Sequence, residues 1–463
     1  MRFRARPRRY DAVSDGSGRT MPGGRRMATV RPVPWEHAYG FGRRSAMTKN
    51  TMTKGDADRR RRDAGRRRYL PVDAAPVKAA VLSVSMLLMS FASINGALPA
   101  MRDDLGVSTQ YSELMSTVPS VVVVVFIFLA GGMSRRFGCK RVITAGMLIL
   151  GAAGIVPVFA ASFPLIFASR LLFGVGMGLF NGLVVDQIGI LYHGDARASM
   201  LGLRASAEQV GQALFTLLAG VLLAWGWHIS FAIYALAFPV AAVFWLIVPD
   251  DLSMRGGAGA AGGEAGEASS RVAGKARLDP IVYLFMLFSI ATLVNYSSVG
   301  VRFPSIAVGL NGEGYNPSFL LSLMPVCGIA AGIAFGWLNR RLGKGVFLLG
   351  IVVWLVVDLL LTFGAASFPA VVVAMLLNSV PLPLCLPYLL NTLAETVDPR
   401  VGVLATSLMF ASMNLGNFLG PVVMNLIASV SRSDSLTIPF PVYAVVFAAI
   451  LVAIMVHDAR VRP

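Results

Sequence analysis

Apolar runs of similar length repeat along most of the chain. From residue 77 onward they approach the roughly 20 residues that an α-helix needs to cross the hydrocarbon core of a bilayer. The twelve runs are approximately 78–100, 112–133, 140–161, 164–187, 199–224, 228–248, 281–303, 317–338, 345–366, 369–392, 401–429 and 438–457. This pattern predicts an all-α membrane protein with that number of transmembrane helices.

Two polar stretches divide these runs. Residues 1–75 hold 20 Lys or Arg and 7 Asp or Glu, so 13 of the 17 net positive charges precede the first run. Such an Arg-, Gly- and Pro-rich tail is expected to be disordered, to be attracted to anionic membrane lipids and to bind no nucleic acid. Met27, Met47 and Met52 each offer an alternative first residue. The predicted parts are a basic cytoplasmic tail (1–75), an N-terminal six-helix lobe (76–248), a flexible cytoplasmic linker (249–279) and a C-terminal six-helix lobe (280–463).

Composition supports the membrane assignment and argues against an enzyme. With 56% hydrophobic residues, 14% charged residues and a mean hydropathy of +0.67, the chain has too little polar surface for a soluble protein of this length. Its three cysteines show no metal-ligand spacing, and we find no nucleotide-binding loop, zinc motif or nucleophile constellation. We therefore predict no enzymatic activity, no cofactor and no metal site.

One polar sequence motif occurs twice along the chain. Residues 131–138 return at 336–343 with an offset of 205, and the same offset aligns Pro99 with Pro304 and Gly211 with Gly416. The matched loop residues are Gly131, Arg135, Arg136 and Gly138 in the first copy and Gly336, Arg340, Arg341 and Gly343 in the second. Duplicated six-helix halves of the same topology are related by a pseudo-twofold axis along the membrane normal.

Basic residues set the expected orientation. They gather after the even-numbered runs, in the linker and at the end of the chain, whereas the opposite loops are short and nearly free of Lys and Arg. By the positive-inside rule, both termini are predicted to be cytoplasmic in a multi-pass protein of the plasma membrane.

Several stretches resemble the major facilitator superfamily of transporters. Residues 97–108, the helix that follows and the loop from Gly131 to Arg141 resemble that family's first two helices and its G-x-L-x-D-R-x-G-R-R signature. Residues 170–178 resemble the family's intramembrane Arg followed by small residues, and 211–228 resemble its fifth helix. The resemblance implies a monomeric secondary transporter that works by alternating access.

The first loop departs from the family signature. Arg135 stands where the family has an acid, while Arg136, Gly138 and Arg141 are retained. We expect Asp186 to form a salt bridge with these loop arginines instead, and its counterpart Asn391 gives the second half no such bridge. The two loops are predicted to act in gating.

Charges inside the predicted spans are the first candidates for function, because burying them in a bilayer is costly. Arg170 and Glu208 lie at similar depths in consecutive spans, so we expect them to pair. Arg170 would attract an anionic group and Glu208 would bind the coupling proton; the alternative is a permanent ion pair between two helices. Arg302, at the outer end of its span, can snorkel to the interface; the alternative is a role in gating or in guiding substrate. Asp358 has no evident role.

Amides supply further candidates. The offset matches Gln209 with Asn414 and Gln212 with Asn417, so each half is expected to offer amides at one depth for a polar solute. Asn95, Asn295, Tyr296 and Asn378 lie in helices that the family places around its cavity. For each single Asn, the alternative is a hydrogen bond between helices.

Proline predicts one break. Pro381, Pro383 and Pro387 fall in a single span and remove backbone donors there, so that helix is expected to bend.

The leading functional prediction is proton-coupled transport of a small polar or anionic organic solute. The alternative is multidrug or metabolite efflux, although the Gly-Pro that the family's drug antiporters carry in the fifth helix is missing between Gly211 and Gly220. A membrane enzyme or receptor would leave the duplicated halves unexplained.

Overall fold

The computed structural model describes residues 74–160, 162–192, 194–249, 280–312, 314–397 and 399–461, all within the unit Arg68–Pro463. The predicted tail and linker lie outside the described residues except at their edges. Within the described ranges the chain forms helices and no β-strand. The predicted all-α class is therefore confirmed.

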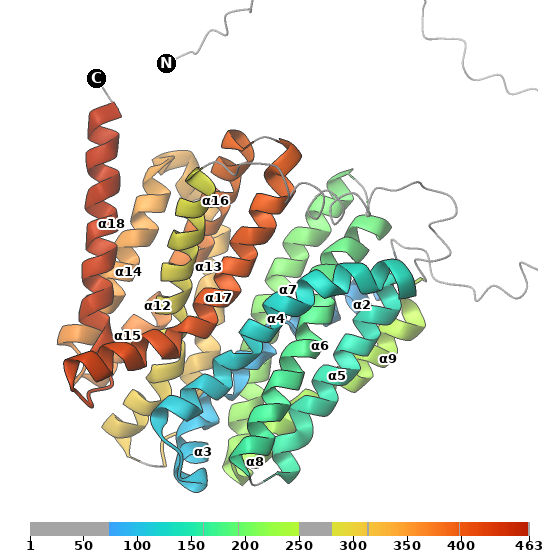
Figure 1. Cartoon of the computed structure of the whole chain (residues 1–463), viewed down its shortest axis with the longest axis horizontal. Coiled ribbons are helices and arrows are strands. Elements are labelled where there is room, and N and C mark those ends of the chain that lie inside the picture. Colours follow the sequence, from blue (N-terminus) through green and yellow to red (C-terminus); the bar gives the residue numbers. More distant parts are fainter. Residues whose placement is uncertain are drawn as a thin grey trace, which may run out of the picture. The chain divides into compact units, whose positions relative to one another are not determined.

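The described helices form two lobes that lie side by side (Figure 1). The N-terminal lobe comprises α2 (Ala75–Met86), η2 (Ser90–Ala97), α3 (Leu98–Leu105), α4 (Thr109–Phe137), α5 (Cys139–Phe159), α6 (Phe163–Leu191), α7 (Gly194–Leu222), η3 (Leu223–Trp225), α8 (Trp227–Ser230), η4 (Phe231–Leu236) and α9 (Ala237–Ile247). The C-terminal lobe comprises α12 (Pro280–Asn311), α13 (Ser318–Leu342), α14 (Gly345–Phe363), α15 (Phe368–Leu377), α16 (Pro381–Thr396), α17 (Pro399–Ser431) and α18 (Pro439–Val461).

The number of possible membrane spans agrees with the hydrophobic pattern. In the described part of the chain, 11 helices are long and apolar enough to cross a bilayer, or up to 12 if the pair Ala75–Met86 and Ser90–Leu105, bent by 47°, is one span. The bend explains why the first predicted run appears as several short elements. Ser90 Oγ donates to Leu87 O at 2.7 Å, a local bond that competes with regular helix at this point.

The matching helices of the two halves each end at a glycine with positive φ. Gly138 ends α4 with φ 90° and Gly343 ends α13 with φ 53°, conformations that favour glycine in both copies of the repeated motif. Asn95 Nδ2 donates to Gly300 O at 3.2 Å across 205 positions of sequence. A residue can touch its own counterpart only close to the axis that relates the halves, so this contact marks the axis.

The predicted proline break is confirmed. Helix α15 ends at Leu377 and α16 begins at Pro381, so the tenth run is interrupted at residues 378–380. Asn378 lies at the interruption, and its Nδ2 donates to Tyr296 O of α12 at 3.1 Å. The backbone N–H groups of Asn378 and Val380 keep partners at the break, Ala374 O at 2.9 Å and Leu377 O at 3.0 Å, as polar groups within a bilayer must.

Candidate functional site

A cavity with an empty volume of about 550 Å³ lies between the lobes. Its walls come from the first span, α4 and α7 on one side and from α12, α13 and α17 on the other. The polar lining residues are Asn95, Ser116, Thr117, Gln212, Thr216, Tyr296, Ser297 and Asn417. The remaining lining residues are apolar or glycine, so the cavity wall offers hydrogen-bonding groups without a charged side chain.

The polar lining is held in place by contacts across the lobe boundary and by one hydrogen bond within the N-terminal lobe. Asn417 Nδ2 donates to Ser120 Oγ at 2.6 Å, and Ser116 Oγ donates to Asn95 Oδ1. The hydroxyl of Tyr296 contacts the side chain of Gln212. These contacts orient amide and hydroxyl groups toward one space, an arrangement suited to a polar solute.

A buried ion pair joins the lobes beside this cavity. Glu113 of α4 contacts Arg302 of α12, and their side chains are only 2% and 4% exposed. Arg302 Nη1 also donates to Leu436 O at 2.9 Å. The expectation that Arg302 snorkels is therefore wrong, because its guanidinium turns inward to a carboxylate. Sequence reasoning missed Glu113, because it stands at the polar start of the predicted run 112–133, where an acid indicates an exposed helix end.

The contact that corresponds to this ion pair by the duplication is made of small residues. By the 205 offset, Glu113 corresponds to Ser318 of α13, which packs directly against Gly96 and Gly220. A Cβ atom at either glycine would overlap Ser318. Next to it, Asn316 Nδ2 donates to Gly220 O at 2.7 Å. One pseudo-symmetric contact is thus ionic, and the other depends on close backbone approach.

Arg170 is not among the residues that line the cavity. It is fully buried, its Nη2 donates to Phe91 O at 3.2 Å, and its guanidinium packs over the rings of Phe173 and Tyr234 at 4.5 and 5.5 Å. Tyr234 itself donates to Ser90 O at 3.0 Å. Arg170 and Tyr234 therefore bind carbonyl groups where the first span is bent, and they stabilise that bend.

The predicted pair of Arg170 with Glu208 does not form. Glu208 instead contacts Arg204 at 2.7 Å, one turn away on its own helix α7. Helix α6 packs mainly against α4 and α5, whereas α7 packs against η2 and α13. Similar depth in neighbouring spans did not bring the two charges together, because their helices face different partners.

The candidate amides divide into two groups. Gln212, Asn417, Asn95 and Tyr296 line the cavity. Gln209 and Asn414 do not, and Asn414 Nδ2 donates to Phe410 O of its own helix at 3.0 Å.

Two further candidates lie inside the C-terminal lobe. Asn295 and Asn378 are both fully buried and are not among the residues that line the cavity. Their amides bind neighbouring groups within the lobe: Asn295 contacts Asp358, and Asn378 contacts Tyr296. These are the contacts between helices that a single Asn in a span often makes.

The loop residues gather at the ends of α4 and α13. Arg135, Arg136 and Arg141 are exposed, as are Arg340 and Arg341, and Arg341 packs over the ring of Trp337 at 4.4 Å. Neighbouring Lys140 is buried, and its Nζ donates to Val248 O at 2.6 Å, at the end of α9. A cation at a helix C-terminus is favourable, so Lys140 ties this loop to its own lobe. The salt bridge from Asp186 and the gating role of both loops stay predictions.

Comparison with known proteins gives one family match. The family described as Major Facilitator Superfamily matches residues 80–347. The Bacillibactin exporter of Bacillus subtilis (strain 168) is 34% identical over 141 residues, which are 29% of this chain and 35% of that protein. The Hexuronate transporter of the same organism is 27% identical over 150 residues, 32% of this chain and 36% of that protein. The chain thus spans about a third of the length of these curated relatives.

A solved structure shares the fold over a longer stretch. The nucleoside transporter NupG has a TM-score of 0.65, is 13% identical and covers 82% of this chain and 98% of its own. At this identity the likeness shows the fold alone.

Proposed function

Because the chain belongs to the Major Facilitator Superfamily, we propose that it is a secondary active transporter of a small polar organic solute. The solute would occupy the cavity between the lobes and cross the membrane by alternating access, without chemical conversion. The protein would act as a monomer in the plasma membrane with both termini cytoplasmic, and protons would drive it.

The observation that carries this proposal is the chemistry of the cavity wall. Asn95, Gln212, Tyr296 and Asn417 offer donors and acceptors, and the lining contains no charged side chain. Such a wall favours a neutral, hydrogen-bonding solute over the anion that Arg170 was expected to attract, because Arg170 binds backbone carbonyls elsewhere.

A second candidate is efflux of a drug or metabolite. Its support is the similarity to the Bacillibactin exporter, together with apolar lining residues such as Met89, Phe91 and Met324. Methionine and aromatic side chains adapt to solutes of varied shape.

Transport assays with matched variants test the proposal. Purified protein in proteoliposomes would be given an imposed pH gradient and a panel of sugars, amino acids, nucleosides, organic acids and cationic dyes. We expect accumulation of a neutral polar solute, and at least a tenfold loss of its transport in Asn417→Leu, about the effect of 1.4 kcal/mol. Asn414→Leu, one turn away on the same helix but off the cavity wall, is the control and should transport normally.

The same panel separates the two candidates. Movement of cationic dyes alone would support efflux and contradict the polar-solute proposal. Equal losses in both Asn variants would remove the cavity wall as the solute site.

A further inference from the structure

One carboxyl group lies buried inside the C-terminal lobe, away from the cavity between the lobes. Asp358 of α14 is fully buried, and Asn295 Nδ2 of α12 donates to its two oxygens at 3.0 and 2.8 Å. Among the described residues we find no Lys or Arg in an ion pair with it. A carboxylate with one amide as its partner in a membrane-spanning helix is energetically costly, and such groups commonly serve ion or proton pathways.

Asn295 belongs to a polar stripe along one face of α12. Thr292, Asn295, Ser298 and Arg302 follow one another at helical spacing, and all four are at most 4% exposed. Ser298 Oγ lies 3.1 Å from the hydroxyl of Tyr443 on α18. The stripe therefore runs from Asp358 to the Glu113–Arg302 pair that joins the lobes.

The titratable groups near Asp358 come from few elements. From α18, Tyr443 is close enough to interact electrostatically with Asp358, Arg302 and Glu113.

Among the described residues, the other neighbouring helices bring no ionisable side chain close to Asp358. Helix α15 carries none. On α16, Cys385 and Tyr388 pack against Gly350 and Phe347, at least two turns of α14 away from Asp358. The arginines of α13 stand at its exposed end.

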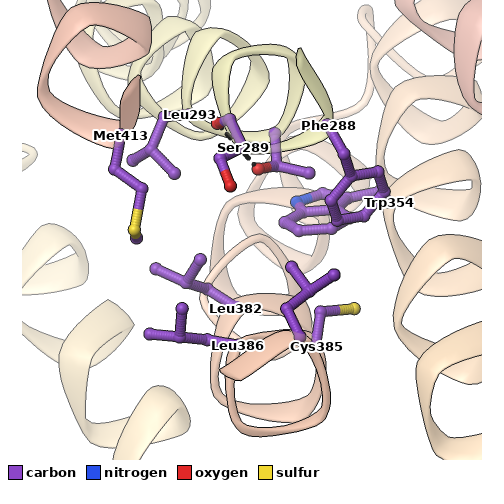
Figure 2. Close-up of a pocket in the computed structure, with 10 residues that line it drawn as sticks. Phe288, Ser289, Leu293, Trp354, Leu382, Cys385, Leu386 and Met413 are labelled. Carbon is purple, nitrogen blue, oxygen red and sulfur yellow. Dashed lines mark hydrogen bonds between the residues drawn. The ribbon is translucent and has the colours of Figure 1, made fainter. Parts of the chain in front are cut away.

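A small cavity approaches the Asp358–Asn295 pair from one side. It is lined by residues that include Ser289, Thr292 and Trp354, so it lies one turn from Asn295 on α12 and one turn from Asp358 on α14. Figure 2 shows Trp354 with the nitrogen edge of its ring on the side where Ser289 lies. The buried indole N–H has no hydrogen-bond partner among the described groups. The polar side of this cavity could hold about one water molecule.

We propose that Asp358 is a proton-binding site of the C-terminal lobe, reached by water through the cavity beside Trp354. A hydronium ion would transfer its proton to a carboxylate oxygen and leave as water. The amide of Asn295, whose Oδ1 has no partner among the described groups, would then turn so that this oxygen accepts the new O–H. The stripe through Ser298 and Tyr443 would transmit the change in charge to the Glu113–Arg302 contact.

The ligand set favours a proton over a metal cation. Asn295 presents its amide nitrogen to the carboxylate, and the described residues contain no cluster of three or more His, Cys, Asp or Glu that could hold a metal ion. Only the use of the proton in transport rests on the proposed function; the binding itself does not.

The test measures protonation directly on the purified full chain. Dicyclohexylcarbodiimide, an apolar reagent that modifies protonated carboxyl groups, would be applied in mildly acidic and mildly alkaline buffer, and the modified peptide identified by mass spectrometry. We expect modification at Asp358 in acid and its loss in alkali. No modification, modification that does not depend on pH, or protection by Na⁺ at constant pH would each overturn the proposal.

Infrared difference spectra between the same buffers provide a second measurement. We expect a carboxylic C=O band that is missing in Asp358→Asn and kept in the control Glu208→Gln, whose carboxylate is paired with Arg204. An identical band in Asp358→Asn would contradict the assignment. Since neither measurement needs a transported solute, failure of the proposed function would leave both results interpretable.

Discussion

Two of the contacts between the lobes occupy equivalent places in the two halves but differ in their chemistry. On one side Glu113 meets Arg302; on the other, its counterpart Ser318 packs against Gly96 and Gly220. A buried ion pair loses its stabilisation steeply when one partner is removed, whereas a contact of small residues depends on shape. The two halves therefore place equivalent residues at the lobe boundary, but one contact is an ion pair and the other is a close approach of small residues.

The largest effect is expected from breaking the ion pair. Glu113→Leu leaves the Arg302 guanidinium buried without its carboxylate, which should lower the free energy of unfolding by about 3–5 kcal/mol. Arg302→Met should behave similarly. The measurement is chemical denaturation of the protein in detergent, with loss of helix content as the signal for unfolding. In a double-mutant cycle the two changes together should cost less than their sum, and simple additivity would show that the pair contributes no coupling.

The next effect concerns the small-residue contact. Gly220→Ala places a methyl group where Ser318 already lies, so we expect a loss of about 1–3 kcal/mol from overpacking. Gly300→Ala is the matched control, since a Cβ there meets nothing within 4 Å. Equal stability of the two variants would mean that close approach at Ser318 is dispensable.

A smaller loss of stability is expected from a substitution at Ser120, further along α4. Asn417 bonds to Ser120 across the boundary, whereas the counterpart of Ser120 is Pro325, which has no hydroxyl to accept such a bond. Ser120→Ala should cost about 1 kcal/mol, the net value of a buried hydrogen bond. Asn414→Ala, which removes a bond within one helix, should cost less in the same thermal unfolding assay.

The smallest effect is expected at Ser318 itself. Ser318→Ala keeps the Cβ that packs on the two glycines and removes only the hydroxyl, so stability should change by about 0.5 kcal/mol or less. A loss as large as that of Glu113→Leu would show that the hydroxyl carries the contact, and the contrast between the two sides would disappear.

The sequence predicted the architecture well because its signals are local or periodic. Apolar runs of membrane length located the spans, Pro381 located the break between α15 and α16, and the repeated glycines located the helix ends at Gly138 and Gly343. Of the candidate amides, Gln212 and Asn417 line the cavity, while their neighbours one turn away do not. The depth of a residue along a span could be counted from the sequence. Which side of the helix faces the cavity could not be predicted from it.

Charged residues were the hardest to place. Arg170 and Glu208 were expected to pair with each other, but Arg170 binds backbone carbonyls and Glu208 contacts Arg204. Arg302 was expected to snorkel, but it is buried against Glu113. Pairing depends on which helices pack together and on their rotation, and both are properties of the whole bundle. The membrane fold, its twelve runs and its duplication follow from the chain alone, because each depends on hydrophobic length and repetition. The ionic contact between the lobes and the isolation of Asp358 with Asn295 arise only in the folded protein, where residues far apart in sequence share one buried space.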